Sequence, residues 1–175
     1  MALVVFLRGV NVGGHKTFRP SALAEKLKRF DVVNIGAAGT FVVRKPATQA
    51  RFTAELRKHL PFETEFMICT GRDVMHIASS DPFEDEPVQP DIVRFLSVLG
   101  KRPRTTAPLP ICVPKDDEWL VKFVRSEGRF VFGMYRRHMK TIGYLGKIDT
   151  IIGARATVRN WNTVAAIVKV LRSGE

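Results

Sequence analysis

The chain has 175 residues, 45% of them hydrophobic and 26% charged, which favours a soluble globular protein with one substantial core or two small ones. Its longest apolar runs, at residues 2–7 and 92–99, are far shorter than the roughly 20 residues of a membrane helix, so the sequence excludes a transmembrane span. Twenty-eight Lys and Arg against seventeen Asp and Glu give a net charge of +11, which suggests attraction to nucleic acid, anionic lipid or phosphorylated metabolites, or a basic surface without a specific partner.

The first 78 residues are predicted to form strands and helices in the order β-α-β-β-α-β. Pro20 suits the first turn of a helix, and Ala38-Gly39 suits the turn of a hairpin. The predicted segments are a strand at 2–7, a helix at 20–30, hairpin strands at 32–37 and 40–44, a helix between Pro46 and Pro61, and a strand at 64–70. This order is that of the ferredoxin-like plait, an antiparallel sheet with two helices packed on one face.

The second half is predicted to begin with strands and to end with helices. Ser79 to Pro90 is rich in Ser, Asp, Glu and Pro, which indicates a linker after a short helix that starts near Thr70. The segments that follow are strands at 91–99, 111–113, 119–124 and 129–135, a helix at 139–152 closed by Gly153, a short strand at 156–158, and a last helix after Asn162.

These elements predict an α+β protein of two small ferredoxin-like (alpha-beta plait) subdomains, with mainly antiparallel sheets and helices on one face. The predicted boundaries are 1–78 for the first subdomain, 79–90 for the linker, and 91–175 for a second α/β subdomain with C-terminal helices. The two halves show no clear sequence repeat.

A glycine-rich turn follows the first strand and reads Leu7-Arg8-Gly9-Val10-Asn11-Val12-Gly13-Gly14, then His15 and Lys16. This turn carries the permanent positive charges of Arg8 and Lys16, the Asn11 amide and accessible backbone N–H groups. Together these groups predict a site for a phosphate or carboxylate. The candidate anion-binding residues are Arg8, Gly9, Asn11, Gly13, Gly14 and Lys16. Neither a Walker loop nor a dinucleotide fingerprint fits the glycine spacing. The alternative is a tight turn in which Arg8 and Asn11 bond local carbonyls and the glycines serve backbone geometry.

A second distinctive block, Arg159-Asn160-Trp161-Asn162-Thr163, precedes the last predicted helix. Stacking on Trp161 with Arg159 against a phosphate would suit a nucleotide at a helix start. The alternative is structural, with Asn160 or Asn162 as an N-cap and Trp161 packed between subdomains.

The densest basic cluster combines Tyr135, Arg136, Arg137, His138 and Lys140, just after the alternating Phe130 and Phe132. Ten basic and three acidic residues between Arg125 and Glu175 place most of the charge excess in this last third. An aromatic strand that leads into a basic helix start predicts an RNA-facing surface. The alternative is that both Phe residues are core and the arginines are merely solvated.

The two blocks resemble a widespread uncharacterised bacterial family, a domain of unknown function whose members carry Leu-Arg-Gly-Ile-Asn-Val-Gly-Gly near the start and Thr-Arg-Asn-Trp-Asn-Thr before the final helix. Here these are Leu7 to Gly14 and Val158 to Thr163. The resemblance implies two small α/β subdomains of ferredoxin-like character and implies no activity. Members commonly have Tyr-Ile-Gln-Ser-Gly-Asn-Val-Val-Phe where this chain has the hairpin at 34–42, so a polar site built on that Gln, Ser and Asn is absent or altered here.

No metal, cofactor or catalytic residue is predicted, because the four histidines are far apart and show no zinc-site spacing. Cys69 and Cys112 stand in separate apolar stretches, where a disulfide is not expected. The start of the chain lacks a basic leader, so we expect a cytoplasmic protein that does not partner a membrane.

The leading hypothesis is therefore a protein that binds an anionic ligand, most of all nucleic acid or a nucleotide, through the glycine-rich turn and the basic C-terminal blocks. The second hypothesis is an enzyme that acts on a small phosphorylated or carboxylated substrate between the subdomains. The third is a structural or oligomerisation domain in which both motifs serve the fold. The sequence leaves open the oligomeric state and whether the two motifs meet.

Overall fold

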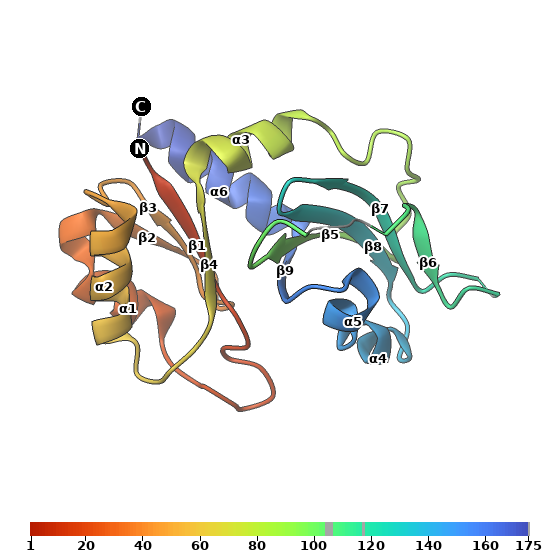
Figure 1. Ribbon diagram of the computed structural model, residues 1–175, viewed down its shortest axis with the longest axis horizontal. Coiled ribbons are helices and arrows are strands. Elements are labelled where there is room, and N and C mark those ends of the chain that lie inside the picture. Colours follow the sequence, from red (N-terminus) through yellow and green to blue (C-terminus); the bar gives the residue numbers. More distant parts are fainter. Residues whose placement is uncertain (104–106, 117, 175) are drawn as a thin grey trace. The chain divides into compact units, whose positions relative to one another are not determined.

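The computed structural model describes residues 1–103, 107–116 and 118–174 and divides the chain into two compact units (Figure 1). The first unit comprises Met1–Ser79 and Asn162–Glu175, and the second comprises Ser80–Trp161. The predicted division differs from this one, because it placed the last helix in the second subdomain, at 91–175, whereas residues 162–175 belong to the first unit. The first unit is thus built from two separate segments of the chain, and the second unit is inserted between them.

The first unit contains one antiparallel sheet with the strand order β2-β3-β1-β4. Its elements are β1 (Leu3–Leu7), α1 (Pro20–Lys26), the 3-10 helix η1 (Lys28–Phe30), β2 (Val32–Ile35), β3 (Thr40–Val43), α2 (Gln49–His59), β4 (Phe66–Thr70), α3 (Gly71–Ser79) and α6, which begins at the unit boundary (Trp161–Ser173). This order of strands and helices is that of the ferredoxin-like plait. The predicted α+β class is confirmed.

Both faces of this first sheet are covered by helices. Leu3 and Val5 point into a core formed with α1 and α2, whereas Val4 and Phe6, with no exposed surface, point to the opposite face. On that opposite face lie α3 and α6 (Figure 1), and a Cβ at Gly71, the first residue of α3, would lie 2.8 Å from Leu171 of α6. The prediction of helices on one face omitted this second layer.

The second unit contains a five-stranded antiparallel sheet with the order β6-β7-β8-β5-β9. Its elements are β5 (Ile92–Leu99), β6 (Ile111–Val113), β7 (Val121–Glu127), β8 (Phe130–Arg136), α4 (Thr141–Leu145), α5 (Ile148–Ile152) and β9 (Ala156–Asn160). The single helix predicted at 139–152 is therefore wrong. Gly143 and Gly146 have low helix propensity, and the chain forms two short helices, the second closed as predicted by Gly153 with φ +78°.

The predicted linker at 79–90 is a packed part of the second unit. Phe83 is only 1% exposed, its ring contacts Phe132 edge to face at 6.2 Å between centroids, and the Arg94 guanidinium lies over it. Further along, the Lys122 Nζ lies 2.9 Å from a Glu86 carboxylate oxygen. One buried aromatic residue and one ion pair thus hold this acidic, proline-containing segment against the sheet.

The centre of the second sheet depends on a glycine. Gly133 of β8 lies opposite Phe95 of β5, and the Phe95 ring covers the space where a side chain would stand. Phe95 has no exposed surface and also contacts Phe123 edge to face at 5.8 Å. Gly133 therefore makes room for the aromatic ring at the core of this unit.

No helix within the described residues is long and apolar enough to cross a bilayer.

Candidate functional site

Residues 11–16 of the glycine-rich turn form a small hairpin, here called the N-terminal finger. The Asn11 N–H donates to the Lys16 carbonyl at 3.2 Å, and the His15 N–H donates to the Val12 carbonyl at 2.9 Å. Gly13 and Gly14, with φ of +56° and +77°, form a two-residue turn that needs two left-handed residues. Backbone geometry therefore accounts for these two glycines, and the tip of the finger is exposed.

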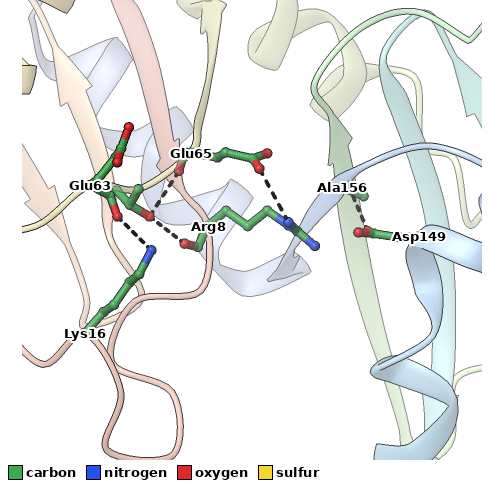
Figure 2. Close-up of polar contacts among 7 residues, drawn as sticks. Arg8, Lys16, Glu63, Glu65, Asp149 and Ala156 are labelled. Carbon is green, nitrogen blue, oxygen red and sulfur yellow. Dashed lines mark hydrogen bonds and ion pairs between the residues drawn. The ribbon is translucent and has the colours of Figure 1, made fainter.

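Two side chains anchor the N-terminal finger to the rest of the first unit. Asn11 donates from Nδ2 to the Ala37 carbonyl at 2.9 Å, and its Oδ1 accepts from the Phe18 N–H at 2.9 Å. Lys16 donates from Nζ to the Glu63 carbonyl at 2.7 Å (Figure 2). Asn11, predicted to bind an anion, thus holds the loop in place with both ends of its amide.

Replacing Asn11 by alanine should lower the free energy of unfolding by about 2 kcal/mol, because two hydrogen bonds are lost and a residue with φ +53° becomes strained. Asn11→Gly loses the same bonds without the strain and should cost about 1 kcal/mol less. Urea unfolding followed by circular dichroism measures both variants. Equal stability of the alanine variant and the parent would contradict an anchoring role.

Arg8 lies where β1 passes into the loop and is fixed by the segment that leads into β4. Its N–H donates to the Glu65 carbonyl at 2.9 Å, and its carbonyl accepts from Thr64 Oγ1 at 2.8 Å. The Arg8 guanidinium Nη1 lies 3.9 Å from a Glu65 carboxylate oxygen (Figure 2). An anion at Arg8 would therefore compete with a carboxylate of the same unit.

Within the predicted basic cluster, Arg136 is occupied by the fold. Its Nε donates to the Trp119 carbonyl at 3.0 Å, and its guanidinium lies 4.2 Å from the centre of the Trp119 ring. Carboxylate oxygens of Asp91 and Glu118 each lie 3.4 Å from its terminal nitrogens. The neighbouring Tyr135 is half-buried against Phe95. These two residues stabilise the unit, which agrees with the structural alternative.

The next residues differ sharply, because the chain leaves the sheet after Arg136. We call residues 137–147 the basic segment; it contains no acidic residue. The side chains of Arg137, Lys140 and Lys147 are exposed and form no hydrogen bond or ion pair with the described residues. Met139 and Ile142 are 85% and 76% exposed. The basic composition of the cluster pointed to Arg137 and Lys140 in the sequence, whereas the exposure of Met139 and Ile142 became apparent only in the structure.

Arg159 of the second motif is buried, which corrects the prediction that it belongs to a surface, whereas Asn160 and Asn162 are exposed. Arg159 is 6% exposed and donates from Nη1 to the Thr157 hydroxyl and the Val158 carbonyl, both at 2.8 Å. Burial lowers the pKa of Arg159 to about 10. The guanidinium stays charged at neutral pH, so burial opposes folding there, and this cost is relieved only as the pH rises above 10.

Trp161 packs within the second unit. Its ring meets Phe83 and Phe132 edge to face, with centroids 5.2 and 5.9 Å away. Asn160 ends β9, and α6 begins at Trp161, earlier than predicted, so Asn162 lies inside the helix. These contacts favour the structural interpretation of Trp161 over stacking on a base.

A small apolar pocket lies between the loop after β5 and the sheet of the second unit. Leu109, Ile111, Phe123 and Val131 are among its lining residues, and Ser126 is its one residue with a polar side chain within the described residues. Among the described lining residues, an anionic substrate would find no charged partner. Across the described ranges, no three His, Cys, Asp or Glu side chains gather as a metal site requires.

Comparisons with known proteins agree with this fold and leave the activity open. Residues 1–121 match the family model described as "Protein of unknown function (DUF1697)". No curated protein matches the chain. A solved structure, that of the conserved bacterial protein SP0830 from Streptococcus pneumoniae, is similar with a TM-score of 0.62 at 15% sequence identity, over 97% of this chain and 98% of that one. At this identity the likeness concerns the fold alone.

Proposed function

The chain belongs to the DUF1697 family of proteins of unknown function, and we propose from its own geometry that it binds nucleic acid through the basic segment. The observation that carries this proposal is the contrast between neighbouring cations. Arg136 is held by two carboxylates and a tryptophan, whereas Arg137, Lys140 and Lys147 extend from the unit without an acidic neighbour in the segment. No carboxylate of the basic segment therefore competes with an external anion for these three cations.

The arrangement suits a polymer better than a single small anion. The three cations are exposed and distributed along residues 137–147, and none is among the described lining residues of the apolar pocket. Successive phosphates of a strand suit cations distributed in this way. Met139 and Ile142 lie between them in the chain and offer apolar contacts to bases or sugars. In the first unit, the exposed tip of the N-terminal finger, with His15 and the accessible N–H groups of its glycines, is a second proposed contact.

Neutralising the three cations together, as Arg137→Gln, Lys140→Gln and Lys147→Gln, should weaken binding to a labelled single-stranded RNA at least tenfold at moderate salt. On a single strand, each cation that contacts a phosphate adds roughly 0.7 to the steepness of log affinity against log salt, so the steepness should fall by about two. Fluorescence anisotropy across a salt series measures both quantities, with single-stranded and duplex DNA as further probes.

A matched control removes the same charge elsewhere. Lys26→Gln, Arg51→Gln and Arg72→Gln change three exposed cations of the first unit and leave the same net charge. We expect this control to weaken binding about twofold or less, since only the long-range attraction falls. Equal weakening by both triple variants would mean that overall charge, and not the basic segment, attracts the polymer.

A further inference from the structure

The two units have the same strand order, and one of them carries an additional strand. In the first unit the four strands lie in the order second, third, first, fourth, as β2-β3-β1-β4. In the second unit β7-β8-β5-β9 repeats this order when β6 is set aside, and α4 and α5 occupy the connection that α2 occupies in the first. The edge formed by β7 in one unit therefore corresponds to the edge formed by β2 in the other.

The corresponding edges differ in what covers them. In the second unit, β6 pairs with β7 in antiparallel register, from Ile111 opposite Phe123 to Val113 opposite Val121. In the first unit, no strand among the described residues pairs with the outer side of β2. In the second unit the β7 edge is therefore extended by another strand, whereas the equivalent β2 edge of the first unit has no strand partner among the described residues.

The open edge presents unused backbone groups. The Arg44 N–H donates to the Asp31 carbonyl at 3.1 Å, which makes these two residues a hydrogen-bonded pair of the β2–β3 ladder. Because bonded residues alternate in an antiparallel ladder, Val33 bonds to β3, whereas Val32 and Asn34 turn their N–H and C=O groups to the outer side. These outward groups have no further hydrogen bond to the described residues.

The features that keep most edge strands from pairing are missing from β2. Its residues are Val, Val, Asn and Ile, without a charge or a proline, and its register with β3 is free of a bulge. All four residues are half-buried, so the strand also carries apolar surface. Native proteins usually place Lys, Pro or a bulge on an edge that must stay unpaired.

We propose that β2 pairs with β2 of a second copy, antiparallel about a two-fold axis at Val33, to join two four-stranded sheets. In this register Val32 of each copy faces Asn34 of the other, so the outward groups of both residues form four backbone hydrogen bonds. The strand is uncharged, so no like charges meet along it. The pairing is self-complementary, which is the condition for a closed two-fold dimer.

The first test is the mass of the whole chain in solution, by sedimentation equilibrium over a wide range of protein concentration. We expect a monomer–dimer equilibrium that strengthens with salt, because the net charge of +11 makes the copies repel each other. Nucleic-acid binding should weaken with salt, so the two properties separate. A chain that stays monomeric at every concentration overturns the proposal and leaves the edge to a different partner.

Proline substitutions test the direction of the backbone groups. Asn34→Pro removes an outward N–H, and the buried Asn34 Oδ1 has no hydrogen-bond partner among the described residues, so the variant should fold and stay monomeric. Val33→Pro removes an N–H that bonds to β3 and should instead destabilise the first unit, which lowers the urea concentration at the midpoint of unfolding. Dimerisation of Asn34→Pro at the affinity of the parent would contradict β2 pairing.

Charged substitutions test the identity of the partner. Val33→Lys and Val33→Glu each place like charges at the two-fold axis, so each variant alone should be monomeric, with folding checked by circular dichroism. A mixture of the two should form a mixed dimer, which native mass spectrometry resolves. A dimer in either variant alone, or no dimer in the mixture of folded variants, counts against the pairing of two β2 strands.

Discussion

Gly133→Ala is expected to lower the free energy of unfolding by about 3 kcal/mol, because overpacking a closed core costs roughly 1–3 kcal/mol and sometimes more. A Cβ on Gly133 would lie 2.4 Å from the Phe95 Cζ, well inside van der Waals contact. The Phe95 ring cannot retreat easily, since Phe123 and Tyr135 lie against it. Urea unfolding measures the loss, which should appear with an unchanged dependence on urea concentration.

The same substitution at Gly143 is a matched control. Apart from the backbone of α4 itself and the adjacent residues, no described atom lies within 4 Å of a Cβ at Gly143, so alanine there should stabilise the protein by up to about 1 kcal/mol through helix propensity. Shrinking the opposing ring in Gly133→Ala by adding Phe95→Leu should cost less than the sum of the two single changes. Strict additivity of these two changes would show that the Phe95 ring is not what excludes a side chain at Gly133.

Phe83→Ala is expected to cost about 3–5 kcal/mol, the range for truncating a buried phenylalanine. The Phe83 ring is nearly inaccessible and contacts Phe132 and Trp161, so its loss leaves a cavity between two elements. Thermal unfolding and urea unfolding should both report the change.

The control for Phe83 lies in the same segment. Val88 is 86% exposed, and Val88→Ala should change stability by less than about 0.5 kcal/mol. If residues 79–90 were an unpacked linker, the Phe83 and Val88 variants would unfold alike. A small effect of Phe83→Ala would therefore restore the interpretation of this segment as a linker.

The order of elements in the first unit could be predicted because its signals are local. Apolar strands, a hairpin turn at Gly39 and prolines beside the second helix all act within a few residues. The start of α2 is one example, since Thr48 caps the helix by accepting the Arg51 N–H at 3.1 Å. Short-range physical chemistry is what a sequence pattern records best.

The packing of residues 79–90 could not be predicted, because the contacts that decide it are distant in the chain. Phe83 is a single aromatic residue in an acidic, proline-containing stretch, and its partners Phe132 and Trp161 belong to later elements. The composition of the segment indicates solvent exposure, whereas Pro82 and Phe83 in it are buried. Burial of these two side chains, above all the large Phe83 ring, outweighed the polar character of their neighbours.

In the candidate site, too, contacts with distant parts of the chain decide which of two adjacent arginines is available to a ligand. Arg136 and Arg137 are the same residue type at adjacent positions, so a sequence pattern cannot tell them apart. Arg136 nevertheless ends β8 beside Asp91 and Glu118, whereas Arg137 lies beyond the sheet. Arg159 was predicted at the surface because a cation near asparagines suggests an exposed site, but β9 places it in the interior. The carboxylates and strand faces that decide these outcomes come from other parts of the chain.

The discontinuous first unit has a consequence for how the protein is made. A ribosome delivers the chain from its N-terminus, so every residue of the second unit emerges before the first unit receives residues 162–174. Until then the sheet face that carries Val4 and Phe6 lacks α6, whose Val164 and Ile167 are buried in the finished protein. A nascent chain arrested before residue 162 would therefore hold a complete second unit and an unfinished first one, with apolar surface open to chaperones or to aggregation.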